Sequence, residues 1–371
     1  MLIAICMAAA MGIRLLHKVF ASLFGWVCRI QKQPAPLPVP VVVLAPTPQS
    51  PPLKWQRSNS PPINFCPAAG VTDWAEAPLD QFADVMRGGK IGLFQEPWLD
   101  DTPQDLHKSH GLNNWENVSQ LPIWDFIIRN NVPVIIEVGA LIAAWGPEPP
   151  DTYARRAIRN VRLLESLGVS RSQISLKFDE PFVQGLHHCV PRWSKEDVAR
   201  HLLEVRQQIL KALPGLKIGI VESYGIGLEM LVWVVMAAPL DFFELDTNDH
   251  EIHTTDTYIA NLAVLQQTCR ERNVPFGWII WGPDDIMGNR PARPELVTPA
   301  SWCDSALRLF SRMQTGVGDG RLTWPDYLTI ESWSPEWNNQ PRNVPMIGNI
   351  SDPHTLLGVA SIVRNRLRLQ P

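Results

Sequence analysis

From residue 63 onwards, the sequence alternates short apolar segments with longer segments of helical periodicity. One helical segment places Val198, Leu202 and Val205 near one face and is followed by Pro-Gly. Strands that alternate with helices in this way predict a (β/α)8 barrel. A doubly wound sheet is the alternative fold, but it usually has fewer strands, and the first turn here lacks a GxGxxG motif. The eight expected strands are 63–70, 90–98, 132–141, 174–181, 217–223, 241–249, 274–282 and 327–334.

Two segments without this alternation precede the expected barrel. Residues 1–30 are mostly apolar but carry Arg14 and Lys18 inside the run, and a charge at a bilayer centre costs about 2.5–3.5 kcal/mol. We expect an export signal or a membrane-associated anchor, and the alternative is a leader without a targeting role. Residues 31–62 are rich in proline, which favours an extended linker. We therefore expect a secreted, periplasmic or outward-facing membrane-anchored protein whose residues 63–371 form the barrel domain.

The composition argues against several classes of partner. The chain of 371 residues has a formal net charge of −4, and its Lys and Arg residues are dispersed, so we expect no nucleic-acid partner. None of the six cysteines forms a CxxC pair, and HExxH is absent, so we expect no metal and no cofactor. We also expect a monomer. The 15 Trp residues against 4 Tyr residues form a bias that needs an explanation.

Acidic and aromatic side chains recur at the carboxyl ends of the expected strands, where (β/α)8 barrels place their active sites. Carboxylates cleave glycosidic bonds, one as an acid and the other as a nucleophile or base. Aromatic rings stack on sugar faces, which would explain the tryptophan content. The alternative is that individual acids cap the following helix. The candidates in chain order are Glu96, Trp98, Glu137, Trp145, Asp179, Glu180, Glu222, Tyr224, Asp246, Trp281, Asp284, Glu331 and Trp333, and the segment 241–249 also carries Glu244.

The segment "SLKFDEPF", residues 175–182, resembles a motif of the retaining (β/α)8 glycoside hydrolases that include cellulase-like and β-xylosidase-like enzymes. In that clan the fourth strand ends in Asn-Glu-Pro, and its Glu is the acid/base. The matching residues here are Asp179, Glu180 and Pro181. The segment "LPIWDFIIRNNVPVIIEVG" is also similar to the clan's second helix and third strand. The resemblance covers roughly residues 63–340 and implies a divergent member that acts on a poly- or oligosaccharide.

The resemblance implies Glu180 as the general acid, whose pKa would be raised by burial and by Asp179. The clan's nucleophile is a Glu at the end of the seventh strand, where this sequence has Trp281. Glu331 is the preferred substitute and Asp284 the alternative. A Glu180–Glu331 pair favours inversion, and a Glu180–Asp284 pair favours retention. The other candidates are predicted to bind substrate.

Two other functions remain open from the sequence. The first is a metal-dependent barrel enzyme, with Glu180, Glu222 and Asp246 on successive strands and Lys177 as the base. The second is a barrel that binds a glycan without cleaving it, because the seventh strand lacks the clan's nucleophile.

Overall fold

The computed structural model describes the chain over eight ranges, and all of them belong to the unit formed by residues 57–371. The expected signal or anchor (residues 1–30) and all but the last two residues of the expected linker lie outside these ranges. Within them, no helix is both long enough and apolar enough to cross a membrane. The described ranges are 61–67, 74–86, 88–94, 119–138, 149–247, 255–282, 298–332 and 347–368.

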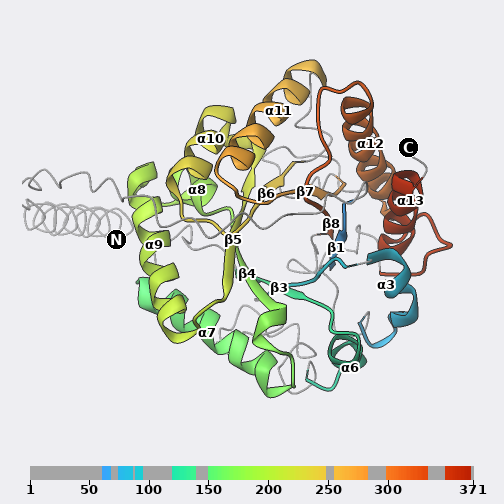
Figure 1. The fold of residues 1–371 in the computed structure, drawn as a ribbon, viewed down its shortest axis with the longest axis horizontal. Helices are drawn as coiled ribbons and strands as arrows, with labels where there is room; N and C mark the ends of the chain where they lie inside the picture. The colour runs from blue at the N-terminus through green and yellow to red at the C-terminus, as the bar shows by residue number, and fades with distance from the viewer. Residues whose placement is uncertain are drawn as a thin grey trace, which may run out of the picture. The chain divides into compact units, whose positions relative to one another are not determined.

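Eight parallel strands form a closed barrel in which each strand pairs with the next along the chain (Figure 1). The pairing of β1 with β8 closes the ring and aligns Ile63 with Leu328. The predicted (β/α)8 barrel is therefore confirmed, and each expected strand is present, several with shorter ends. The strands are β1 (Ile63–Pro67), β2 (Ile91–Phe94), β3 (Val134–Val138), β4 (Ile174–Asp179), β5 (Lys217–Ser223), β6 (Phe243–Asp246), β7 (Phe276–Ile280) and β8 (Tyr327–Ser332).

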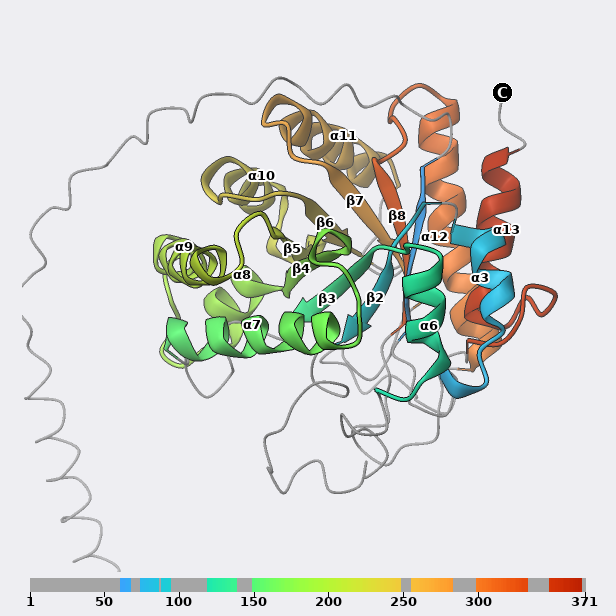
Figure 2. The same ribbon diagram turned by 60° about the horizontal axis from the view of Figure 1, so that its bottom comes forward.

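Helices surround the strands and cover the outer face of the barrel, as Figures 1 and 2 both show. Short helical turns follow β4 and β5, at Gln184–His188 and Tyr224–Ile226, and another precedes β4 at Arg171–Gln173. The α-helices are α3 (Leu79–Met86), α6 (Pro122–Arg129), α7 (Pro150–Ser166), α8 (Pro181–Val183), α9 (Lys195–Ala212), α10 (Leu228–Ala237), α11 (Thr255–Glu271), α12 (Pro299–Gly318) and α13 (Leu356–Arg368).

Helix α9 shows how local sequence sets these elements. Ser194 caps its first turn, because the Ser194 hydroxyl accepts a hydrogen bond from the Asp197 backbone N–H at 3.1 Å. The Asp197 carboxylate in turn accepts a hydrogen bond from the Ser194 hydroxyl. Such a reciprocal cap satisfies amides that have no partner inside the helix. The predicted apolar face is buried, including Val198, Leu202 and Val205. The helix ends before Pro214-Gly215, as the sequence predicts.

The lower end of the barrel, where the strands begin, is filled by aromatic rings. Phe242 and Tyr327 lie edge to face with ring centroids 6.5 Å apart, and the Lys90 ammonium lies 5.0 Å from the Phe242 ring centre. Gly219 and Gly277 make room for these rings, because a Cβ at either position would collide with Phe242 or Tyr327. This packing closes the lower end, so chemistry in the barrel interior depends on its carboxyl end.

Candidate functional site

The centre of the barrel is occupied by Lys177 of β4, which is fully buried. Its Nζ lies 2.7 Å from Glu137 Oε2 on β3, 3.0 Å from Glu244 Oε2 on β6 and 2.8 Å from Glu331 Oε2 on β8. The three carboxylate side chains are at most 3% exposed. These four residues, named here the Lys177 cluster, therefore point inward from four strands and meet in the interior.

Two further polar side chains extend the cluster towards β1. Thr329 donates a hydrogen bond to Glu244 Oε1 at 2.7 Å, and the Asn64 amide donates to the Thr329 hydroxyl at 3.3 Å. Buried ions destabilise a fold unless partners and hydrogen bonds compensate their lost hydration. For Glu244, both carboxylate oxygens have such partners, since Lys177 donates to Oε2 and Thr329 to Oε1.

The charges of the cluster change the proton affinities of its members. Burial raises the pKa of Glu137 and of Glu331 to about 8, although Lys177 opposes the shift. Burial disfavours the charge of Lys177, but Glu137, Glu244 and Glu331 together raise its pKa well above the usual value. Lys177 therefore stays charged at neutral pH, which argues against the predicted alternative in which it acts as a base.

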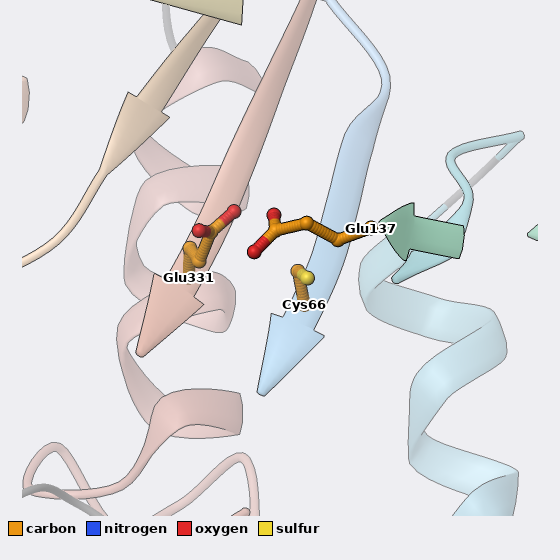
Figure 3. Close-up of side chains that lie close together, drawn as sticks. All are labelled: Cys66, Glu137 and Glu331. Atoms are coloured by element: carbon orange, nitrogen blue, oxygen red, sulfur yellow. The ribbon is translucent and has the colours of Figure 1, made fainter. Parts of the chain in front are cut away.

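Cys66 on β1 adds a thiol to one side of the cluster. Cys66 is aligned with Glu331 across the β1–β8 pair. Its Sγ, one oxygen of Glu137 and one oxygen of Glu331 all lie within 4.8 Å of one another, and all three residues are buried (Figure 3). Gly92 on β2 leaves space for this thiol, because a Cβ there would collide with Cys66 Sγ. Burial, and next the Glu331 charge, raise the pKa of the Cys66 thiol well above its usual value.

Glu180 follows the last residue of β4 and adopts a left-handed backbone conformation, with φ 40° and ψ 46°. Its backbone N–H donates to the Val221 carbonyl of β5 at 3.0 Å, and its own carbonyl accepts from Gln184 N–H at 2.9 Å. The residue is half-buried at the carboxyl end of the strand. The structure thus places the predicted general acid where barrel active sites lie.

Glu222 of β5, which is predicted to bind substrate, points away from the barrel interior and contacts α8. Its neighbour Val221 aligns with the inward-facing Glu244, so alternation directs Glu222 away from the interior. There its two oxygens accept hydrogen bonds from the backbone N–H groups of Phe182 at 2.7 Å and Val183 at 3.3 Å. Burial raises its pKa well above the usual value, against these two hydrogen bonds. Glu222 caps α8, because those amides have no helical partner.

Two other predicted binding residues meet at the ends of β6 and β7. The Trp281 indole N–H donates a hydrogen bond to Asp246 Oδ1, and both residues are buried. Tyr224 is half-buried after β5, where its hydroxyl accepts a hydrogen bond from the Asn261 amide of α11 at 2.7 Å. Its ring also packs edge to face on Tyr258, with centroids 4.9 Å apart. Tyr224 therefore contacts α11, whereas Asp246 and Trp281 are hydrogen-bonded to each other.

The remaining candidates divide into two groups. Asp179 shares the inward alternation of Lys177 and lies close enough to Glu137 to contribute to its raised pKa. The other group lies outside the described residues, so its predicted roles stay predictions: Glu96, Trp98, Trp145, Asp284 and Trp333.

The sequence analysis does not single out Cys66, and it names Lys177 only as the base of the metal-dependent alternative and Glu244 only as an acid of its segment. A two-residue spacing is the signal that could identify Lys177 and Glu244, because side chains two residues apart in a strand point to the same face. Lys177 lies two residues before the candidate Asp179, and Glu244 lies two residues before the candidate Asp246. No comparable signal marks Cys66, because a cysteine in an apolar strand is more often a core residue.

Comparisons with known proteins support the fold. No protein-family model matches the chain, and a search of curated proteins finds no match. A GH5_18 structure from Streptomyces cattleya in complex with GlcNAc is 12% identical, with TM-score 0.50, over 85% of this chain and 82% of that one. A GH10 xylanase from Thermobacillus composti is 12% identical, with TM-score 0.47, over 82% and 97% of the two chains.

A third similar structure belongs to a different class of enzyme. It is a putative deoxyribose-phosphate aldolase from Toxoplasma gondii ME49, 14% identical, with TM-score 0.39, over 73% of this chain and 88% of that one. At 12% identity, the similarity to the GH5_18 structure shows the fold alone, so the reaction has to be argued from the side chains.

Proposed function

We propose that the chain is a divergent glycoside hydrolase that acts on a poly- or oligosaccharide, with Glu180 as the general acid. The observation that carries this proposal is the place of Glu180, which directly follows β4 at its carboxyl end and is half-buried there in a left-handed backbone conformation. A general acid must lie at the substrate, and the carboxyl ends of the strands are where a barrel binds it.

The backbone strain at Glu180 supports a functional role. Three described non-glycine residues have positive φ: Asn131, Glu180 and Asn273. Asn tolerates the left-handed region well, whereas for a longer side chain it costs about 1–2 kcal/mol. Backbone strain of this kind concentrates at active sites, where the surrounding structure maintains it for function. A glycine at this position would remove the strain, so the strained glutamate supports a role for its carboxylate.

Asp284 is the better proposal for the second carboxylate, although the sequence favours Glu331. The Glu331 side chain is fully buried, and its Oε2 already accepts a hydrogen bond from Lys177 at 2.8 Å. Attack on a sugar would require that contact to break inside the barrel. In the sequence, Asp284 comes four residues after the end of β7 and three residues after Trp281. A Glu180–Asp284 pair also corresponds to the retaining arrangement that the resemblance implies.

The substrate class follows from the carboxylates and the aromatic residues together. Trp281 presents an indole whose N–H is fixed by Asp246 at the strand ends, and Trp98, Trp145 and Trp333 follow other strands in the sequence. Indole rings suit the apolar faces of sugars. An apolar N-terminus followed by a proline-rich linker suits an extracellular or cell-envelope polysaccharide as substrate.

Hydrolysis of a polysaccharide panel tests the proposal, with release of reducing ends as the measurement. We expect the wild-type chain to cleave at least one β-linked glucan, xylan or mannan. Glu180→Gln keeps the side-chain shape but removes the acid proton, and should lower turnover about 10²–10⁴-fold. Glu229→Gln is the matched control, because Glu229 is exposed on α10. Full activity of Glu180→Gln on an identified substrate would reject Glu180 as the acid.

A metal-dependent enzyme is the second candidate, favoured by the ligand atoms of Cys66, Glu137 and Glu331 within 4.8 Å of one another. The set predicted for it from the sequence is not assembled, because Glu222 is turned towards α8. A chelator in the same assay separates the candidates. Turnover that resists the chelator supports the glycoside hydrolase, and loss of turnover supports the metal enzyme. Binding of a glycan without cleavage would instead support the non-catalytic barrel.

A further inference from the structure

We propose that Cys66, Glu137 and Glu331 form a binding site for one borderline divalent cation of the Zn²⁺ type. The three residues come from β1, β3 and β8, and the strand pairing fixes their positions. The proposal concerns cation binding and is independent of the reaction that the barrel catalyses.

The spacing of the ligand atoms is close to that around a bound metal. One atom from each residue lies within 4.8 Å of the other two. Zinc bonds of about 2.0–2.3 Å place neighbouring ligand atoms roughly 3.3–3.8 Å apart. Since 4.8 Å is the upper limit of the spacing here, a bound cation would draw the three ligand atoms together by at most about 1.5 Å. Figure 3 shows the Glu137 and Glu331 carboxylates directed towards each other, with the Cys66 thiol beside them.

A buried oxygen without a hydrogen-bond partner points to a ligand independently of this spacing. Within the described part of the chain, Glu331 Oε1 is buried and has no hydrogen-bond partner, whereas Oε2 accepts from Lys177. The Glu331 side chain is fully buried. A buried carboxylate oxygen without a hydrogen-bond partner is unfavourable, because the lost contact with water is not replaced. A cation that bound Oε1 would provide the missing partner.

The donor types select the class of cation. Carboxylates alone would suit Mg²⁺, Ca²⁺ or Mn²⁺, whereas a thiolate shifts the preference towards Zn²⁺ and its spectroscopic substitute Co²⁺. Three protein ligands with a remaining open position are typical of catalytic rather than structural zinc sites. Gly92 supports a specific role for the thiol, because only a residue without a Cβ leaves space for Cys66 Sγ.

Titration of the chelator-treated full-length chain with Co²⁺ tests the site. We expect one equivalent to bind, to produce a near-ultraviolet thiolate-to-cobalt absorption band and to be displaced by Zn²⁺. Cys66→Ser should abolish the band. Cys303→Ser is the matched control, because Cys303 is also a buried free cysteine but lies on α12. The band should persist in this control.

Two results would overturn the proposal. One is the absence of stoichiometric Co²⁺ binding by the wild-type chain, and the other is a band that survives Cys66→Ser, which would place the thiolate elsewhere. Glu137→Gln gives a second test that keeps the thiol, and it should weaken Co²⁺ affinity at least tenfold. Circular dichroism verifies that each variant is folded. Unchanged affinity in a folded Glu137→Gln variant would also reject the site.

Discussion

On β3, Val134, Ile136 and Val138 face the surrounding helices, whereas Glu137 between them faces the barrel interior. The two faces of the sheet therefore carry opposite kinds of side chain. Burial of the outer face contributes about 25 cal/mol per Å² of apolar surface and requires no partners. The charged groups inside stabilise the fold only when every charge keeps its partner, because loss of one partner leaves another charge buried and uncompensated. The comparison predicts that the outer layer responds to lost apolar area, whereas the interior responds to the loss of a single charged group.

Removal of the Lys177 ammonium group should have the largest effect on the free energy of unfolding. Lys177→Met would leave Glu137, Glu244 and Glu331 without the ammonium that contacts them. Breaking a buried ion pair in this way costs about 3–5 kcal/mol. Urea denaturation at pH 7 measures the loss. Lys217→Met is the control, because that side chain is 67% exposed and lies 3.8 Å from Asp241. A loss below about 1 kcal/mol for Lys177→Met would mean that the interior charges are not coupled.

A cavity in the outer layer should have a somewhat smaller effect. Ile136 is fully buried on the helix-facing side of β3. Ile136→Ala should lower the free energy of unfolding by about 2–4 kcal/mol, through lost burial and a residual cavity. Because no titratable group is removed, the loss should be the same at pH 5 and pH 8. A loss that changed with pH would show that the two faces are not independent.

The interior should also make stability depend on pH. Burial raises the pKa of Glu137 and Glu331 from 4.5 to about 8. Between these values the native protein binds more protons than the unfolded chain, so the free energy of unfolding falls as pH rises. Lys177, Glu244, Cys66 and Asp179 face these groups, and Lys177 remains charged throughout.

Two such carboxyls correspond to a slope on the order of 1–3 kcal/mol per pH unit. Urea denaturation from pH 5 to pH 8, with a chelator present, measures this slope. Glu331→Gln should make it shallower, because the amide does not titrate. Equal slopes for the wild type and this variant would contradict the assignment of Glu331.

The smallest expected effect on stability comes from a substitution at the carboxyl end of the barrel, and this one should raise the free energy of unfolding. Glu180→Gly removes a side chain from a left-handed backbone, with φ 40°. It should stabilise the fold by about 0.5–1 kcal/mol, because the relieved strain exceeds the added entropy of the unfolded chain. The same variant should lose hydrolysis. Asn131→Gly is a comparison at a helix end, where we expect a change of only a few tenths of a kcal/mol. If Glu180→Gly lowered the free energy of unfolding, the left-handed backbone at Glu180 would not be strained, and this support for a functional role would be lost.

The sequence by itself determined the barrel, the order of its strands and the strand ends at which acids gather. These features depend on local patterns, namely short apolar strands, helical periodicity and turn residues. The predicted strand at 174–181 is β4, and Glu180 follows it directly. The likeness to glycoside hydrolases gained structural support only as a shared fold.

Only the tertiary structure decided which acids face the interior. A strand of a parallel barrel is buried on both faces, so its apolar pattern does not distinguish inward from outward positions. In β5, closure of the barrel directs Val221 inward and Glu222 towards α8, which sequence alone does not indicate. Lys177 and Glu331 are 154 residues apart, and their contact arises from the ring that joins β4 to β8. Long-range pairing of this kind follows from register and closure rather than from any local segment.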